Sequence, residues 1–160
     1  MRHPIRTLVA LAALPLLAGC EAAWGTDPSV TLKMNGNYVM GNDFVTRYTT
    51  SPAPEIVLSR GMNGTGITAF FTLPTAPAPG TYTIVDGTTT AVSTSPVVVG
   101  TVNAVRTDTR PAKGSYHIDS GSITLVSVSP EKVTGTFTTT VRASADAPVQ
   151  EFSGRFAAFR

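Results

Sequence analysis

The sequence predicts an all-β fold, an antiparallel β-sandwich or curled barrel of about eight to ten strands. Three observations support this prediction. Val, Ile, Phe and Tyr, which fit a half-buried pleated sheet, are scattered singly between Thr and Ser. The 160-residue chain contains 14 Gly and 12 Pro, which supply turns. After residue 20, no segment shows a sustained apolar repeat with the period of a helix.

Turn signals divide the first part of the β region into strands. Residues 30–34 alternate between apolar and polar, and Asn35-Gly36 follows them. This dipeptide predicts a hairpin leading into residues 38–40, because both residues tolerate the positive φ of a type I′ turn. Residues 46–54 contain two prolines that cannot donate to a β-ladder, so they are predicted to form a loop. Further strands are predicted over residues 55–60, 66–73 and 81–85.

Alternation is clearest toward the C-terminus. Within residues 132–143, the even positions from 134 to 140 are all Thr, which predicts a solvent-facing side of an antiparallel sheet. The opposite side carries Val133, Gly135, Phe137, Thr139 and Val141. The short link at residues 144–148 predicts a hairpin with a last strand at residues 149–159. Other strands are predicted at residues 96–106, 115–118 and 122–128.

The N-terminus has the features of an export signal. Arg2 and Arg6 precede an uncharged apolar run at residues 7–17, which is shorter than the ~20 residues that a membrane-spanning helix needs. The run ends in Leu17-Ala18-Gly19-Cys20, which resembles the lipobox of bacterial lipoproteins. The resemblance implies cleavage after Gly19 and a diacylglycerol with a further acyl chain on Cys20. Several buried acyl chains would anchor the protein stably.

This resemblance divides the chain into three parts: a signal peptide at residues 1–19, a tether at residues 20–28, and a single β domain at residues 29–160. Cys20 is then the lipidated residue and the contact with the membrane. Position two of the mature chain is Glu21 rather than Asp. Among lipoproteins of Gram-negative bacteria, this favours the outer membrane over the inner membrane.

Short motifs at the starts of the predicted strands carry a second resemblance. They are Asn35-Gly36, Gly80 to Ile84, Gly121 to Leu125, Gly135 to Phe137 and Gly154 to Phe156. The set resembles a group of small all-β envelope lipoproteins of unknown function. It implies an antiparallel sandwich or curled barrel and transfers no functional residue.

Composition excludes some classes of partner. The ten Arg and Lys that follow residue 19 are matched by ten Asp and Glu, without a basic run. This neutral balance argues against nucleic acid as a partner. Cys20 is the only Cys, so no disulfide can form within the domain. The partners that remain are the membrane, through Cys20, and an envelope protein or polymer.

Candidate sites for chemistry are few. His117 is the only His after residue 19, and Asp119 would share its face of a strand; two ligands are too few for zinc. Asp43, Asp86 and Asp108 lie in turns without the spacing of a calcium loop. A loop cluster of Arg106, Asp108, Arg110 and Lys113 is a weak anion-binding candidate. We therefore predict no enzyme, no cofactor and no metal site.

Three functions follow from these features. We expect a membrane-anchored envelope lipoprotein that acts as a non-enzymatic binding or structural module. The alternative is a lipocalin-like barrel whose interior binds a small apolar ligand, which requires a continuous internal cavity. A hydrolase that uses His117 is the third.

Overall fold

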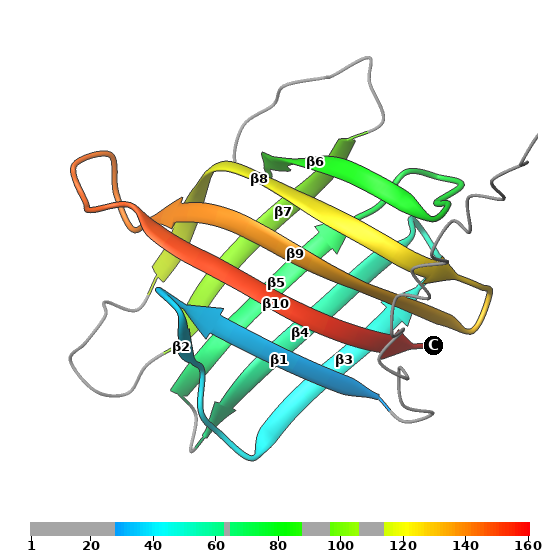
Figure 1. The fold of residues 1–160 in the computed structure, drawn as a ribbon, viewed down its shortest axis with the longest axis horizontal. Helices are drawn as coiled ribbons and strands as arrows, with labels where there is room; N and C mark the ends of the chain where they lie inside the picture. The colour runs from blue at the N-terminus through cyan, green and yellow to red at the C-terminus, as the bar shows by residue number, and fades with distance from the viewer. Residues whose placement is uncertain (1–27, 63–64, 88–96, 106–113) are drawn as a thin grey trace, which may run out of the picture.

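The computed structural model describes residues 28–62, 65–87, 97–105 and 114–160, and every regular element within these ranges is a strand (Figure 1). The prediction of an all-β fold is therefore confirmed. No helix long and apolar enough to cross a membrane occurs in these ranges. The described residues form ten strands: β1 (Ser29–Met34), β2 (Asn37–Tyr38), β3 (Asp43–Thr49), β4 (Glu55–Met62), β5 (Thr65–Thr72), β6 (Gly80–Asp86), β7 (Val97–Val105), β8 (Gly114–Val128), β9 (Lys132–Arg142) and β10 (Gln150–Phe159).

All ten strands belong to one hydrogen-bonded sheet, in the order β2-β1-β10-β3-β4-β5-β7-β6-β8-β9. Because β9 also pairs with β10, the eight strands from β10 to β9 close into a ring, and β1 and β2 form a flap on β10. Most neighbours are antiparallel; β6 with β7 and β3 with β10 are parallel.

The ring is flattened into two layers (Figure 1). β1, β10, β9, β8 and β6 form a front layer, whose strands cross those of a rear layer made of β3, β4, β5 and β7. β8 connects the layers, because Tyr116 near its start pairs with Val102 of β7. The opposite closure is minimal: β10 meets β3 through the single pair Phe159 and Arg47. A closed ring that is flattened into two layers agrees with the prediction of a β-sandwich or curled barrel.

The core lies between the two layers and is dominated by aromatic and branched side chains. Three rings contact one another in a tilted arrangement across it: the centroids of Phe71 and Phe137 are 4.9 Å apart, and those of Phe137 and Phe152 are 5.1 Å apart. Each fully buried side chain of this size stabilises the fold by about 1.5–3 kcal/mol relative to an exposed one. The largest side chains with almost no exposed surface are Tyr116, Phe71, Phe152, Phe156, Leu32, Ile56, Leu58, Ile123, Leu125, Val98, Val102 and Val133.

Glycine and phenylalanine interlock where β9 meets β10. Gly135 is paired with Phe156, and Phe137 is paired with Gly154. A Cβ on Gly154 would lie 2.6 Å from Cε1 of Phe137, and one on Gly135 would lie 2.8 Å from Cζ of Phe156. The repeated Gly-x-Phe pattern thus provides room for each ring opposite a residue without a side chain.

Several predicted elements are confirmed. Asn35 and Gly36 have φ of 50° and 77°, as a type I′ turn requires, and they connect β1 to β2. The predicted hairpin between the last two strands is present as the antiparallel pair β9 and β10. All ten strands, from the start of β1 at Ser29 to the end of β10 at Phe159, belong to the same sheet.

Three predictions are wrong. The predicted loop at residues 46–54 contains half of β3, whose exposed Phe44 and Val45 hide the alternation. The strands predicted at residues 115–118 and 122–128 are parts of one strand, β8. The polar residues between them keep the pairing with β9, with a register shift between Ile118 and Ser120. Thr134 is 1% exposed, although Thr136 and Thr138 on the same strand are exposed as predicted.

A candidate binding face on the front layer

The outer surface of the front layer carries two parallel rows of polar side chains. In an antiparallel ladder, paired residues project to the same face, so the register assigns each row. The first row contains, from β6 to β1, Thr81, Thr124, Thr136, Arg155 and Thr31. The second row contains, in the same order of strands, Thr83, Ser122, Thr138, Ser153 and Lys33. We call these ten side chains the outer rows.

The chemistry of the outer rows is uniform. Eight of the ten side chains carry a hydroxyl, two are cations, and all ten are exposed or half-buried. Some hydroxyls bond to one another across strands, as Thr81 and Thr124 do at 2.9 Å. Along β10, the carboxylate of Glu151 lies on the same face directly beside the second row, and the hydroxyl of Ser153 donates to it at 3.5 Å.

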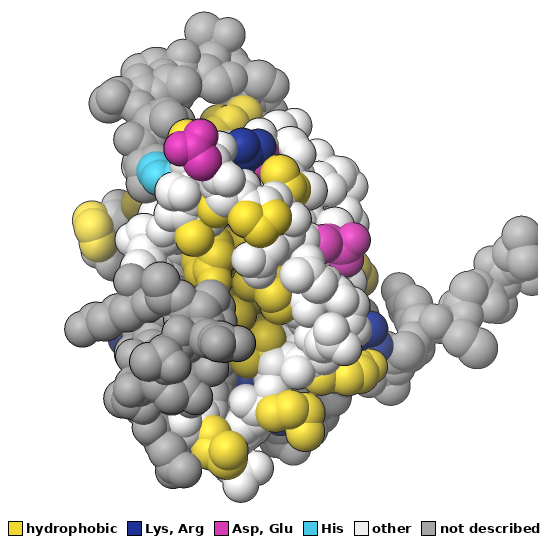
Figure 2. All heavy atoms as spheres, turned by 90° about the vertical axis from the view of Figure 1, so that its left-hand side faces the viewer, with side chains coloured by type: hydrophobic (Ala, Val, Ile, Leu, Met, Phe, Trp, Pro, Cys, Tyr) yellow, Lys and Arg dark blue, Asp and Glu magenta, His cyan; other side chains and the backbone are white. Residues whose placement is uncertain are grey.

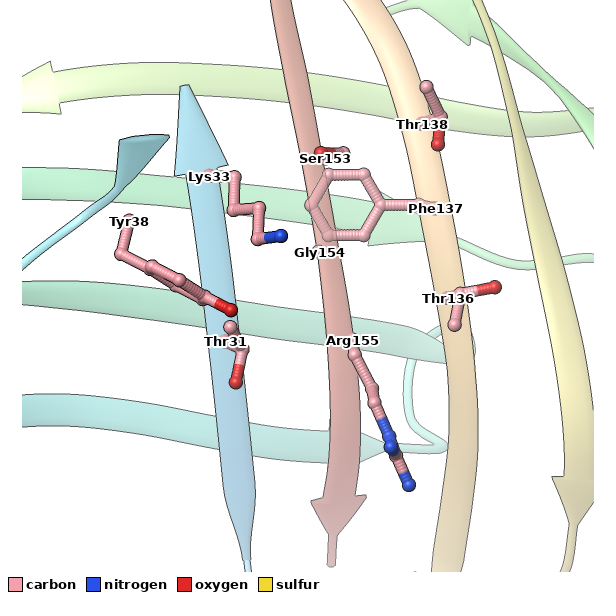
Figure 3. A pocket seen from close by; sticks show the side chains of 9 residues that line it. All are labelled: Thr31, Lys33, Tyr38, Thr136, Phe137, Thr138, Ser153, Gly154 and Arg155. Atoms are coloured by element: carbon pink, nitrogen blue, oxygen red, sulfur yellow. The ribbon is translucent and has the colours of Figure 1, made fainter. Parts of the chain in front are cut away.

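A groove crosses the outer rows where β1, β10 and β9 meet (Figure 3). Its volume is about 400 Å³, and its lining includes Lys33, Tyr38 and Arg155. The Nζ of Lys33 lies 4.6 Å from the centre of the Tyr38 ring, which is 60% exposed. The ammonium group of Lys33 points toward β10, whereas Arg155 extends along β10 toward the end of that strand. The groove therefore presents two cations, an aromatic ring and several hydroxyls to solvent.

These groups are suited to binding a polar ligand. A hydroxyl both donates and accepts hydrogen bonds, whereas Lys and Arg only donate. The guanidinium of Arg155 can grip a carboxylate with two parallel bonds, and Lys33 adds a point charge. Within the described ranges, no three His, Cys, Asp or Glu side chains are grouped as a metal site would need.

A second surface feature is apolar and lies at one end of the ring. Figure 2 views the end of the molecule at the left of Figure 1 and shows hydrophobic side chains in a band along it. The exposed apolar side chains near this end are Tyr38 of β2, Met40 in the link between β2 and β3, Phe44 at the start of β3 and Met62 at the end of β4. A cavity of about 170 Å³ there is lined in part by Met40 and Arg60. Arg60 donates from Nη1 to the carbonyl of Val30 at 3.0 Å, which ties the flap to β4.

His117 and Asp119 share one face of β8, as predicted, and line one groove together with Arg142 and Ala145. The Nδ1 of His117, 52% exposed, lies 3.3 Å from Oδ2 of Asp86, which is 8% exposed. Asp119 instead forms an ion pair with Arg142, with 2.7 Å between Nη2 and Oδ2. The pairing of β6 with β8 brings Asp86 to the histidine, a contact that the sequence analysis did not predict.

The remaining candidates lie elsewhere in the chain. Asp43 is an exposed residue at the start of β3. Cys20 and the loop cluster of Arg106, Asp108, Arg110 and Lys113 lie outside the described residues.

Sequence reasoning identified the threonine face of β9 but missed the cations beside it. Lys33 and Arg155 lie more than a hundred residues apart in the chain, and only the pairing of β1 with β10 brings them together. In β1, Thr31 and Lys33 alternate with apolar residues that are buried, and this pattern could have placed both side chains on the outer face.

No family model, curated protein or solved structure matches this chain. Its function must therefore be argued from the geometry described above.

Proposed function

We propose that this protein is a lipid-anchored protein of the bacterial cell envelope and a non-enzymatic binding module whose outer rows hold an envelope polymer. The observation that carries the proposal is the register of five strands, which aligns eight hydroxyls and two cations on one exposed face. In this account the lipid on Cys20 keeps the domain near the membrane, with an outer membrane as its expected location.

The anchor is supported by the sequence Leu17-Ala18-Gly19-Cys20, placed directly after an apolar run. Mass spectrometry of the protein extracted from membranes tests it. We expect an N-terminal peptide that begins at Cys20 and carries a diacylglycerol and an amide-linked acyl chain. The Cys20→Ser variant should lose metabolic palmitate labelling. A native peptide with an unmodified Cys20 thiol would contradict the proposed anchor.

The alternative of an apolar ligand inside the ring is less well supported. Ligand-binding cavities leave the side chains that line them accessible. Phe71, Phe152 and Leu58, on facing strands of the two layers, have no accessible surface at all. The three rings occupy the space between the layers that such a ligand would need. The densely packed interior therefore favours a site on the outside.

Co-sedimentation with insoluble cell-wall material tests the proposed binding face. The detergent-purified mature protein should sediment with the wall, and Thr138→Glu should abolish this, because it places a negative charge in the centre of the outer rows. Thr101→Glu is the matched control, since Thr101 lies on the outer face of the rear layer, where it pairs with Phe70. Equal loss of sedimentation in both variants would remove the outer rows as the binding face.

A further inference from the structure

Positive charge is concentrated at one end of the outer rows. Lys33 and Arg155 are the only charged side chains among the ten, and they lie on the neighbouring strands β1 and β10. Glu151, the next residue of β10 on this face beyond Ser153, adds one negative charge beside the two positive ones. Thr31 is paired with Arg155, and Lys33 with Ser153, so the two cations are diagonal neighbours. The chain after residue 19 has equal numbers of positive and negative side chains. This local pair of cations is therefore a property of the face and not of a generally basic protein, and it favours an anionic ligand.

The shape of the face favours a chain-like ligand. Each row spans five strands, and the four spacings of roughly 4.8 Å between neighbouring strands make the rows about 19 Å long. Small-molecule sites are concave and bury most of their ligand, whereas these rows are exposed on a sheet surface. A polymer can contact many weak hydrogen-bonding groups in succession, and the joint contacts raise its overall affinity.

Tyr38 adds an aromatic surface at the cationic end (Figure 3). Its ring borders the groove next to Thr31 and Lys33 and is 60% exposed. An aromatic ring offers a flat apolar surface and, in Tyr, a polar tip, which suits ligands that are partly apolar and partly wet. A sugar ring has this character, with apolar C–H faces and hydroxyls around its edge.

We propose that the outer rows bind a carboxylate-bearing polysaccharide, with its carboxylates at Lys33 and Arg155, a sugar ring against Tyr38 and its hydroxyls along the threonines. This inference rests on the proposed function, because it takes the outer rows as the binding face. It adds the chemical class of the polymer: a chain that is both hydroxylated and anionic. The hydroxyl rows alone would accept a neutral glycan, and the cations alone would accept any polyanion.

The test uses two polymers that differ only in charge. Polygalacturonate carries a carboxylate on each sugar, and its methyl ester has the same backbone with the charge removed. Binding to the mature protein is measured by titration at low salt. We expect binding of polygalacturonate at least about tenfold tighter than binding of the ester, the ratio expected when one charge-assisted hydrogen bond is lost. The preference should weaken as salt is added, since exposed charges are screened.

Substitutions test whether Lys33 and Arg155 cause the preference for polygalacturonate over its methyl ester. The double variant Lys33→Gln/Arg155→Gln should bind polygalacturonate and its ester equally, because the cations are gone while the hydroxyl rows remain. The control Arg47→Gln/Arg160→Gln removes the same total charge from exposed residues outside the outer rows and should keep the preference. A loss of preference in the control would overturn the assignment to this face.

Two further comparisons distinguish an anionic polysaccharide from other ligands. Inorganic polyphosphate, a linear polyanion without sugar rings, should bind more weakly than polygalacturonate; equal binding would overturn the polysaccharide assignment. The ester should bind more weakly than polygalacturonate; equal binding would overturn the anionic assignment. If the protein sediments with cell wall through Thr138 but binds neither soluble glycan, the proposed function stands and this inference fails. If sedimentation is insensitive to Thr138→Glu, the proposed function itself fails.

Discussion

The inner and outer faces of β9 and β10 are built from alternate residues of the same two strands, yet they have opposite properties. Inward, Phe137 and Phe156 are buried opposite glycines. Outward, Thr136 and Thr138 are exposed beside Ser153 and Arg155. Where alternation holds, from Gly135 to Thr139 of β9, one face of the strand supplies packing, and we expect the other to change without loss of the fold. Substitutions on the two faces should therefore differ in their effect on stability.

The largest effect is expected from removal of the central ring. Phe137 contacts both Phe71 and Phe152, so Phe137→Ala should leave a cavity that the two layers cannot close. We expect the free energy of unfolding to fall by about 3–5 kcal/mol. Urea denaturation followed by circular dichroism measures this. A loss below about 1 kcal/mol, the typical effect of an average substitution, would mean that the three rings do not hold the layers together.

A smaller effect is expected from the glycine opposite that ring. Gly154→Ala places a methyl group 2.6 Å from Cε1 of Phe137, and overpacking of this kind costs about 1–3 kcal/mol. Phe137→Leu, whose shorter side chain ends before the contact, removes the part of this cost that is due to the ring, whereas the main-chain oxygen of Thr31, 2.7 Å from the same methyl group, remains. Gly154→Ala should cost less in that background than in the wild type. Equal costs in both backgrounds would mean that the glycine is needed for another reason.

The smallest effect on stability is expected on the outer face. Thr136→Val/Thr138→Val keeps the β-branched shape and removes two hydroxyls from exposed positions, so the free energy of unfolding should change by no more than about 0.5 kcal/mol. The same variant should bind cell wall less tightly. If its melting temperature falls as far as that of Gly154→Ala, the two faces are not separable.

Local patterns in the sequence predicted much of the fold but not its closure. Alternation identified the buried and exposed sides of β9, and Asn35-Gly36 identified the first hairpin, because both signals act within a few residues. β3 was missed since exposed apolar side chains at Phe44 and Val45 break the expected period. The ring is closed by Phe159 and Arg47, a pairing across most of the chain that no local pattern reports.

The binding face was predictable only in part, for the same reason. The threonines of β9 share one strand, so their common face could be read directly. The cations come from β1 and β10, the first and last strands in the sequence, and their alignment depends on the register between those strands. Asp86 and His117 show the same effect, because residues 31 positions apart meet only once β6 and β8 have packed.

Selection of a charged, hydroxylated chain by the exposed side of the front layer can be measured on three proteins. They are the wild type, the Lys33→Gln/Arg155→Gln variant and the Arg47→Gln/Arg160→Gln control, each titrated with polygalacturonate in an isothermal calorimeter. We expect the affinity for polygalacturonate to fall at least about tenfold in the Lys33→Gln/Arg155→Gln variant and to stay unchanged in the control. Identical affinities for all three proteins would show that the two cations do not select the polymer.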